Sequence, residues 1–139
     1  MRILIADDDP VFRTLVKDLL VEWGYETASA CDGTEAWQVI QRDEAPPLLL
    51  LDWMMPGLDG FELCRRIRAD AKQEGAYILL MTGSWRKEEI IRVLVAGADD
   101  YLIKPFDPVD LKIRLRVAQR ILDLRREVTG LRAAAATAA

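Results

Sequence analysis

Four short apolar runs, each followed by a charged or hydroxyl-bearing residue, constrain the fold of this chain most strongly. They alternate with segments whose apolar residues recur at helical spacing. Uninterrupted apolar runs of this length are typical of parallel strands that are buried on both faces. The runs are Ile3–Ala6 before Asp7, Leu48–Leu51 before Asp52, Tyr77–Met81 before Thr82, and Tyr101–Ile103 before Lys104.

The full pattern predicts five strand–helix units. We expect strands at about 2–7, 25–30, 48–52, 77–82 and 100–103, and helices at about 10–23, 34–42, 61–69, 86–96 and from 108 onward. Right-handed crossovers between such units give a doubly wound α/β fold with a parallel five-stranded sheet. The flavodoxin-like order 2-1-3-4-5 is one of the two common orders, and the pattern alone does not select it.

Composition narrows the classes of function. A chain of 139 residues suits one domain, and a net charge of −4 without a basic tract before the last helix argues against nucleic-acid binding. No apolar run has the length of a membrane span, and the N-terminus lacks the shape of a signal peptide. We expect Cys31 and Cys64 to be free thiols in a reducing cytoplasm.

The chain contains no histidine. This excludes Ser-His-Asp catalysis and a zinc site built on imidazole. If the protein handles phosphate through a phosphohistidine, that histidine belongs to a partner.

The last predicted helix is unusually long. A heptad-like series of apolar residues continues along it: Val117, Ile121, Leu124, Val128 and Leu131. Two interpretations stay open, an ordinary amphipathic helix with a ragged end, or a helix that pairs with another copy or leads to a further domain. We divide the chain into a domain at 1–122 and an extension or linker at 123–139, whose Ala-rich end should fray.

Polar residues at the ends of different strands form the candidate site. Because the carboxyl ends of parallel strands share one edge of the sheet, Asp7, Asp8 and Asp52 should meet there with Thr82 and Lys104. Each like-charged pair at about 4 Å costs on the order of 4 kcal/mol at an effective dielectric near 20. Lys104 offsets part of this cost, and a hard divalent cation, Mg²⁺, suits a cluster of carboxylate oxygens. Singly, each of these residues is more often a helix cap, a turn residue or a surface charge.

In this combination and order, the motifs resemble the receiver domain of two-component response regulators. The resemblance covers about residues 2–120. It rests on four segments: Ile3–Pro10, Leu51–Gly60, Met81–Gly83 and Ala96–Phe106.

The resemblance implies a role for each acidic residue. Asp52 is similar to the aspartate that accepts a phosphoryl group. Asp7 and Asp8 match the acidic pair that holds Mg²⁺. Asp8 and Asp52 would be direct ligands, Asp7 would act through water, and the backbone carbonyl of Met54 would be the third protein ligand.

The resemblance also implies a switch. Thr82 matches the hydroxyl that moves to the phosphoryl group, and Tyr101 matches the aromatic residue that responds to this movement. Lys104 matches the lysine that pairs with a phosphoryl oxygen, and the Lys104–Pro105 bond is expected to be cis.

The implied donor is a histidine kinase or a phosphotransfer protein. The implied readout surface is formed by the fourth helix, fifth strand and fifth helix, where a homodimer could also form, and a downstream output domain is a further partner to consider. The resemblance implies no enzyme activity beyond self-catalysed phosphotransfer to Asp52 and slow autodephosphorylation.

Two alternatives stay open. One is a phosphate-independent interaction module, which does not require the intact Asp52, Thr82 and Lys104. The other is a phosphohydrolase with an aspartyl nucleophile, in which a second acid would stand where this chain has Met54.

Overall fold

The computed structural model describes residues 1–73, 75–83 and 86–138. It contains one five-stranded parallel sheet with the order β2-β1-β3-β4-β5. The strands are β1 (Arg2–Ala6), β2 (Glu26–Ala30), β3 (Leu48–Asp52), β4 (Tyr77–Thr82) and β5 (Asp100–Ile103). This arrangement confirms the predicted fold and settles the strand order in favour of 2-1-3-4-5.

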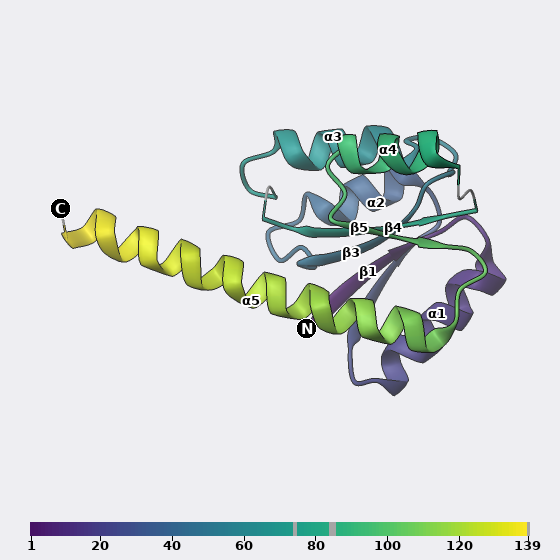
Figure 1. Cartoon of the computed structure of the whole chain (residues 1–139), viewed down its shortest axis with the longest axis horizontal. Helices are drawn as coiled ribbons and strands as arrows, with labels where there is room; N and C mark the ends of the chain where they lie inside the picture. The colour runs from purple at the N-terminus through teal and green to yellow at the C-terminus, as the bar shows by residue number, and fades with distance from the viewer. Residues whose placement is uncertain (74, 84–85, 139) are drawn as a thin grey trace.

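Five helices cover the two faces of the sheet. They are α1 (Pro10–Glu22), α2 (Gly33–Ile40), α3 (Gly60–Ala69), α4 (Lys87–Val95) and α5 (Pro108–Ala138). Helices α2, α3 and α4 lie on one face, and α1 and α5 lie on the other (Figure 1).

Alternation along the strands divides the apolar core into two layers. Leu49 and Leu51 of β3 pack with residues of α2, α3 and α4, whereas Leu48 and Leu50 pack with residues of α1 and α5. Successive strand side chains point to opposite faces, so a strand covered on both faces needs apolar residues at every position. This explains why the central strands have uninterrupted apolar sequences.

Aspartates fix the starts of three helices directly after strands or loops at one edge of the sheet. Asp9 accepts a hydrogen bond from the Val11 amide, and Asp32 accepts one from the Glu35 amide. Asp59 does the same for the Glu62 amide at the start of α3. These capping carboxylates satisfy amide groups that have no partner within the helix. Asp9, Asp32 and Asp59 therefore have a structural role as helix caps.

The last helix extends beyond the body of the domain (Figure 1). Leu122 is its last buried apolar residue. The helix continues through the Ala-rich end to Ala138, and the expected fraying of this end stays a prediction. Alanine has the highest helix propensity, which favours this continuation. The division of the chain after residue 122 stays a prediction. Within the described ranges, no helix is both long and apolar enough to cross a membrane.

Candidate functional site

The carboxyl ends of the strands bring together the acidic residues singled out in the sequence. Asp7 and Asp8 follow β1, and Asp52 is the last residue of β3. One carboxylate oxygen from each of the three lies within 4.8 Å of the others. The expected acidic cluster is therefore present at this edge of the sheet.

Asp7 is completely buried, and both of its carboxylate oxygens have partners. Its Oδ2 accepts a hydrogen bond from Nζ of Lys104 at 2.7 Å, and its Oδ1 accepts one from the Asp9 amide at 2.9 Å. Arg13 also donates to the backbone carbonyl of Asp7 at 2.6 Å. Because Asp7 is held in this way, Asp8 and Asp52 are the carboxylates with more freedom to bind a ligand.

Asp52 is nearly buried, with 7% of its surface exposed. The pKa of its carboxyl group is raised from 3.8 to about 6, first by burial and next by the negative charge of Asp7, while the ammonium group of Lys104 opposes the shift. A cation bound beside Asp52 would favour the ionised carboxylate. The electrostatics of the cluster therefore favour a bound cation.

The backbone around Asp52 is tightly packed. Gly60 donates from its amide to the Trp53 carbonyl at 2.9 Å, which closes the loop between β3 and α3. A Cβ at Gly60 would lie 2.9 Å from the Cα of Trp53, closer than atoms in this position can approach. A glycine at this position thus lets α3 begin directly against the end of β3.

Lys104 is placed by the strand end and by an aromatic contact. Its amide donates to the Thr82 carbonyl at 2.7 Å, and the following Lys104–Pro105 peptide bond is cis, as the sequence predicted. The ammonium nitrogen lies 4.2 Å from the centre of the Phe12 ring and 3.3 Å from Oδ1 of Asp52. The cation is therefore directed into the acidic cluster.

Thr82 and Tyr101 lie on the same face of the sheet. Tyr101 is paired in register with Leu80, and Thr82 lies two residues further along β4. Since side chains two residues apart share a face, Thr82, Leu80 and Tyr101 all point toward the α2–α3–α4 layer. Thr82 is buried, and Tyr101 is half-buried. This geometry allows a change at Thr82 to reach Tyr101 along one face.

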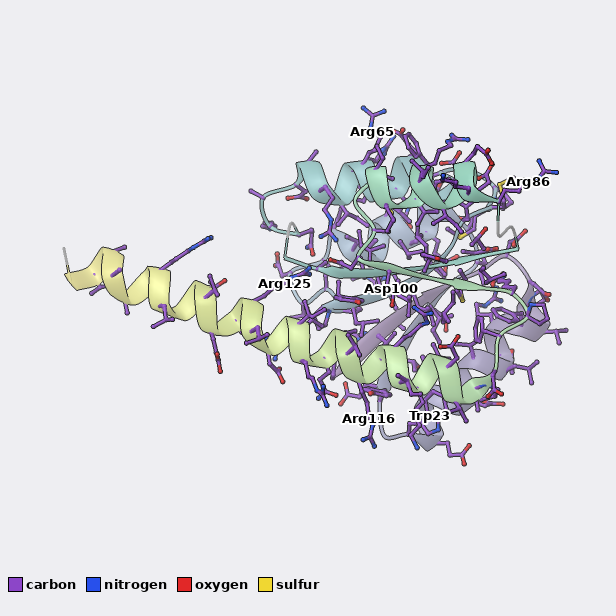
Figure 2. The ribbon with its side chains drawn as sticks, viewed as in Figure 1. Trp23, Arg65, Arg86, Asp100, Arg116 and Arg125 are labelled. Carbon is purple, nitrogen blue, oxygen red and sulfur yellow. The ribbon has the colours of Figure 1, made fainter. Side chains whose placement is uncertain are left out.

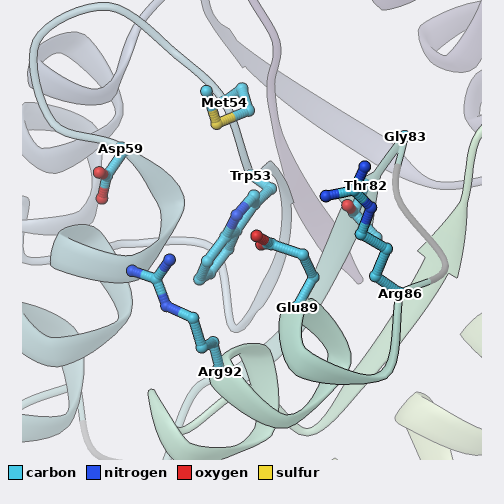
Figure 3. Close-up of a pocket in the computed structure, with 8 residues that line it drawn as sticks. All are labelled: Trp53, Met54, Asp59, Thr82, Gly83, Arg86, Glu89 and Arg92. Carbon is cyan, nitrogen blue, oxygen red and sulfur yellow. The ribbon is translucent and has the colours of Figure 1, made fainter.

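A cleft of about 880 Å³ adjoins the site between the β3–α3 loop and α4 (Figure 3). The guanidinium group of Arg92 lies over the rings of Trp53, at 6.0 Å, and Phe61, at 5.3 Å. Met54 is 71% exposed at the mouth of the cleft, but nothing in the structure tests a metal-binding role for its carbonyl group. The lining residues are Trp53, Met54, Asp59, Thr82, Gly83, Arg86, Glu89 and Arg92.

Sequence reasoning missed several residues that shape the site. Phe12 and Arg13 come from the first turn of α1, where we considered only the helical pattern. A second group consists of charged residues that recur every three positions: Arg86, Glu89 and Arg92. This spacing could have indicated a polar helix face, but only the fold shows that the face contacts Trp53. Contacts of this kind depend on distant parts of the chain.

Comparison with known proteins identifies the family. The family described as the response regulator receiver domain matches residues 3–116. This covers most of the chain and includes the acidic cluster and all strand residues except Arg2 at the start of β1. The chain therefore belongs to the receiver-domain family of two-component signalling, as its motifs suggested.

Two curated relatives differ in how much of their length is matched. The chain is 35% identical over 116 residues to a chemotaxis protein CheY homolog of Campylobacter jejuni, which covers 83% of this chain and 89% of the relative. It is 39% identical over 119 residues to the DNA-binding response regulator MtrA of Mycolicibacterium smegmatis, which covers 86% of this chain and 50% of the relative. The chain is thus similar to a relative of nearly its own length and to half of a longer one.

A solved structure provides a close spatial match. The receiver domain of the sensor histidine kinase PA1611 from Pseudomonas aeruginosa is 31% identical, with a TM-score of 0.77 and coverage of 88% of this chain and 97% of that chain. That structure was solved with a magnesium ion coordinated in its active-site cleft. The acidic cluster of this chain is the group of residues that could hold such an ion.

Proposed function

We propose that this chain is a Mg²⁺-dependent phosphoacceptor switch, in which Asp52 receives a phosphoryl group from a partner's phosphohistidine. The observation that carries the proposal is the convergence of Asp7, Asp8 and Asp52 with the ammonium group of Lys104 at one edge of the sheet. Membership of the receiver-domain family favours a histidine kinase or a phosphotransfer protein as the donor. The phosphohistidine must belong to that partner, because this chain has no histidine of its own.

The donor set fits Mg²⁺. The three clustered side chains offer only carboxylate oxygens, which suit a hard cation better than a soft one. Asp8 and Asp52 would be direct ligands with the Met54 carbonyl, and Asp7 would act through water, since Lys104 and the Asp9 amide already engage its oxygens. When bound, Mg²⁺ neutralises charge on the phosphoryl oxygens and on the carboxylates.

The residues of the chain then perform the transfer. A carboxylate oxygen of Asp52 attacks the phosphorus, the P–O bond of an acyl phosphate forms, and the P–N bond to the donor imidazole breaks. Such transfers depend mainly on positioning and charge neutralisation. Lys104 supplies a positive charge 3.3 Å from Asp52, and Thr82 supplies a hydroxyl group at the end of the neighbouring strand.

The new phosphoryl group shifts the equilibrium between two conformations of the domain. It adds negative charge and acceptor oxygens, to which the Thr82 hydroxyl can donate. Movement of Thr82 would vacate space on the face that it shares with Tyr101, and Tyr101 would turn inward. The surface formed by α4, β5 and α5 would change with it.

This surface is the part of the domain that partners would read. We propose that it supports self-association together with the projecting end of α5, or that α5 connects the domain to an output domain. The similarity to half of the longer MtrA favours the second arrangement, and the similarity to the CheY homolog favours action as a separate domain. The reduced thiols that we expect for Cys31 and Cys64 fit a cytoplasmic site of action.

Phosphorylation by acetyl phosphate with Mg²⁺ tests the proposal. Mass spectrometry should show the addition of one phosphoryl group to the wild-type chain and none to Asp52→Asn. The matched control is Asp107→Asn, because Asp107 is an exposed carboxylate near the same edge whose capping bond to the Val109 amide an asparagine can keep. An Asp52→Asn variant that still gains the phosphoryl group would refute the assignment.

Substrate turnover distinguishes the phosphoacceptor switch from a phosphohydrolase and from a phosphate-independent interaction module. A phosphohydrolase would release phosphate from small esters over many cycles, whereas the switch would show one self-limited cycle per phosphorylation. An interaction module without phosphate chemistry would show no mass change at all.

A further inference from the structure

An apolar seam on α5 continues past the point where the helix leaves the domain. We define the seam as Val117, Ile121, Leu124, Val128 and Leu131. We propose that the seam pairs with the same seam of a second copy in a parallel two-stranded coiled coil. The inference deepens the self-association proposed above, because it assigns a partner, an orientation and a register to it.

Exposure shows that the seam from Leu124 onward is not used within the chain, whereas Ile121 is partly buried and packs against the core. Leu124 is 59% exposed, Val128 45% and Leu131 71%. The helix already packs on the sheet through a different stripe, which comprises Leu111, Leu115, Ala118 and Leu122. The exposed part of the seam, from Leu124 to Leu131, is therefore additional to the residues that dock α5 on its own domain.

The residue types along the seam favour two parallel helices. The spacings alternate four and three residues, which places Ile121 and Val128 at heptad position a, and Leu124 and Leu131 at position d. β-Branched residues at a with leucine at d favour a two-stranded parallel coiled coil. The first d residue, Val117, lies in the part of α5 that packs on the domain and is itself 42% exposed.

The charges beside the seam suit this register. Glu127 falls at position g and Arg132 at position e of the following heptad, so each Glu127 would face Arg132 of the second copy. Within the described part of the chain, no ion pair is recorded for either residue, and both are exposed. A parallel dimer would form this pair twice, once on each side of the seam.

One unfavourable pair between the two helices is partly offset by contacts within the domain. Arg120 at position g would face Arg125 of the second copy at position e. Arg125, however, donates hydrogen bonds to Asp99 and to the carbonyl groups of Gly75 and Ala76 of its own chain. Figure 2 shows Arg125 at the junction between α5 and the sheet. Asp99, a carboxylate that Arg125 shares with Arg68, therefore offsets part of this charge before a second copy approaches.

The same contacts fix the direction of the projecting helix. Asp99 also accepts hydrogen bonds from Arg68 of α3 and from the Ile78 amide of β4. The point at which α5 leaves the domain is thus connected, through Asp99, to α3 and to β4. A helix whose direction is set beforehand loses less freedom on pairing, which favours association.

Charge reversal in the full chain tests the register. Glu127→Arg or Arg132→Glu would replace two attractive pairs by two repulsive ones, and each should weaken the dimer about tenfold in sedimentation experiments. The double variant should regain wild-type association, and a mixture of the two single variants should form heterodimers. Arg126→Glu, on the outer face of the helix, is the matched control and should have no effect.

Disulfide trapping tests the orientation. In a Cys31→Ser background, Leu131→Cys should form a covalent dimer on mild oxidation, because d residues of parallel helices face each other. Arg126→Cys in the same background should form it much more slowly. Equal rates would overturn the parallel arrangement.

The coiled-coil proposal and the phosphoacceptor proposal can be overturned independently of each other. Each measurement is made with and without Mg²⁺ and beryllofluoride, and phosphorylation of Asp52 is followed by mass in the same variants. A monomer under all conditions, or single reversals without effect, would overturn the coiled coil while leaving phosphorylation intact. Absence of phosphorylation in a chain that still shows the charge-swap pattern would overturn only the phosphoacceptor proposal.

Discussion

The Nζ atom of Lys104 lies 3.3 Å from Oδ1 of Asp52. It is closer still, at 2.7 Å, to Oδ2 of Asp7. Lys104 therefore balances two carboxylates in the metal-free site, and on phosphorylation it would be in place to pair with a phosphoryl oxygen. The ammonium group of Lys104 also repels a divalent ion. Removal of this ammonium group should therefore favour metal binding and slow phosphotransfer.

Lys104→Met should slow phosphorylation by acetyl phosphate about a hundredfold, the order of loss seen when one preorganised charge donor is removed. Mg²⁺ should bind at least as tightly as to the wild type, because the site becomes more negative. Isothermal titration calorimetry measures Mg²⁺ binding, and mass spectrometry measures phosphotransfer. Lys112→Met, on the exposed face of α5, is the control. Loss of Mg²⁺ binding together with phosphorylation would show that Lys104 maintains the structure of the site instead.

Asp52 should destabilise the metal-free fold at neutral pH. Its carboxyl pKa is raised from 3.8 to about 6, so the folded chain holds this proton more tightly than the unfolded chain does. Stability must then fall as the pH rises from about 4 to 6, and the full penalty is present above 6. A shift of about two units corresponds to about 3 kcal/mol.

Asp52→Asn should therefore raise the free energy of unfolding by about 1–3 kcal/mol at pH 7.5 in the presence of a chelator. The gain should nearly vanish at pH 3, which lies below the pKa of the carboxyl group in both the folded and the unfolded state. Urea denaturation at several pH values measures this, and Asp107→Asn should give no comparable trend. A gain that is the same at both pH values would contradict the assigned cause.

The sequence predicted the central strands better than the helix ends. The limits of β3 and β4 were predicted to the residue, because an apolar run buried on both faces ends where the first polar residue meets the edge of the sheet. The limits of β5, a mostly half-buried strand at the side of the sheet, were also predicted to the residue. The helix expected at 34–42 instead covers Gly33–Ile40. Its start depends on the Asp32 cap, and helix ends are commonly displaced by one or two residues.

The acidic cluster could be predicted because each member follows a strand, and parallel topology brings strand ends together. The contacts that hold α5 could not be predicted in this way. Arg68, Asp99 and Arg125 come from a helix, a loop and a second helix, and each alone resembles an ordinary surface charge. Only the packing of α3 and α5 against the start of β5 shows that they form one network.

Thr82 should couple phosphorylation to the change in the α4–β5 region. Thr82→Ala should still be phosphorylated on Asp52, about tenfold more slowly because one hydrogen bond to a charged group is lost. Hydrogen exchange in peptides from α4 and β5 should respond to beryllofluoride in the wild type and not in this variant. Thr14→Ala, at an exposed position on α1, should respond as the wild type does. A normal response in Thr82→Ala would place the coupling elsewhere.

Arg125 should hold the projecting end of α5 to the domain. Its guanidinium group bonds to the Asp99 carboxylate and to the carbonyl groups of Gly75 and Ala76, and it lies 5.6 Å from the centre of the Tyr77 ring. Because its side chain is about one-third exposed, we expect Arg125→Met to cost about 1–2 kcal/mol of the free energy of unfolding, less than a fully buried ion pair would. Hydrogen exchange should increase in α5 beyond Leu122 and change little between Leu111 and Ala118, which remain packed on the sheet. Arg126→Met removes an equally long cation one residue away, at an exposed position, and should leave both measurements near their wild-type values. If the two variants behaved alike, the direction of the helix would be set by its apolar packing alone, and the Asp99 contact would be incidental to it.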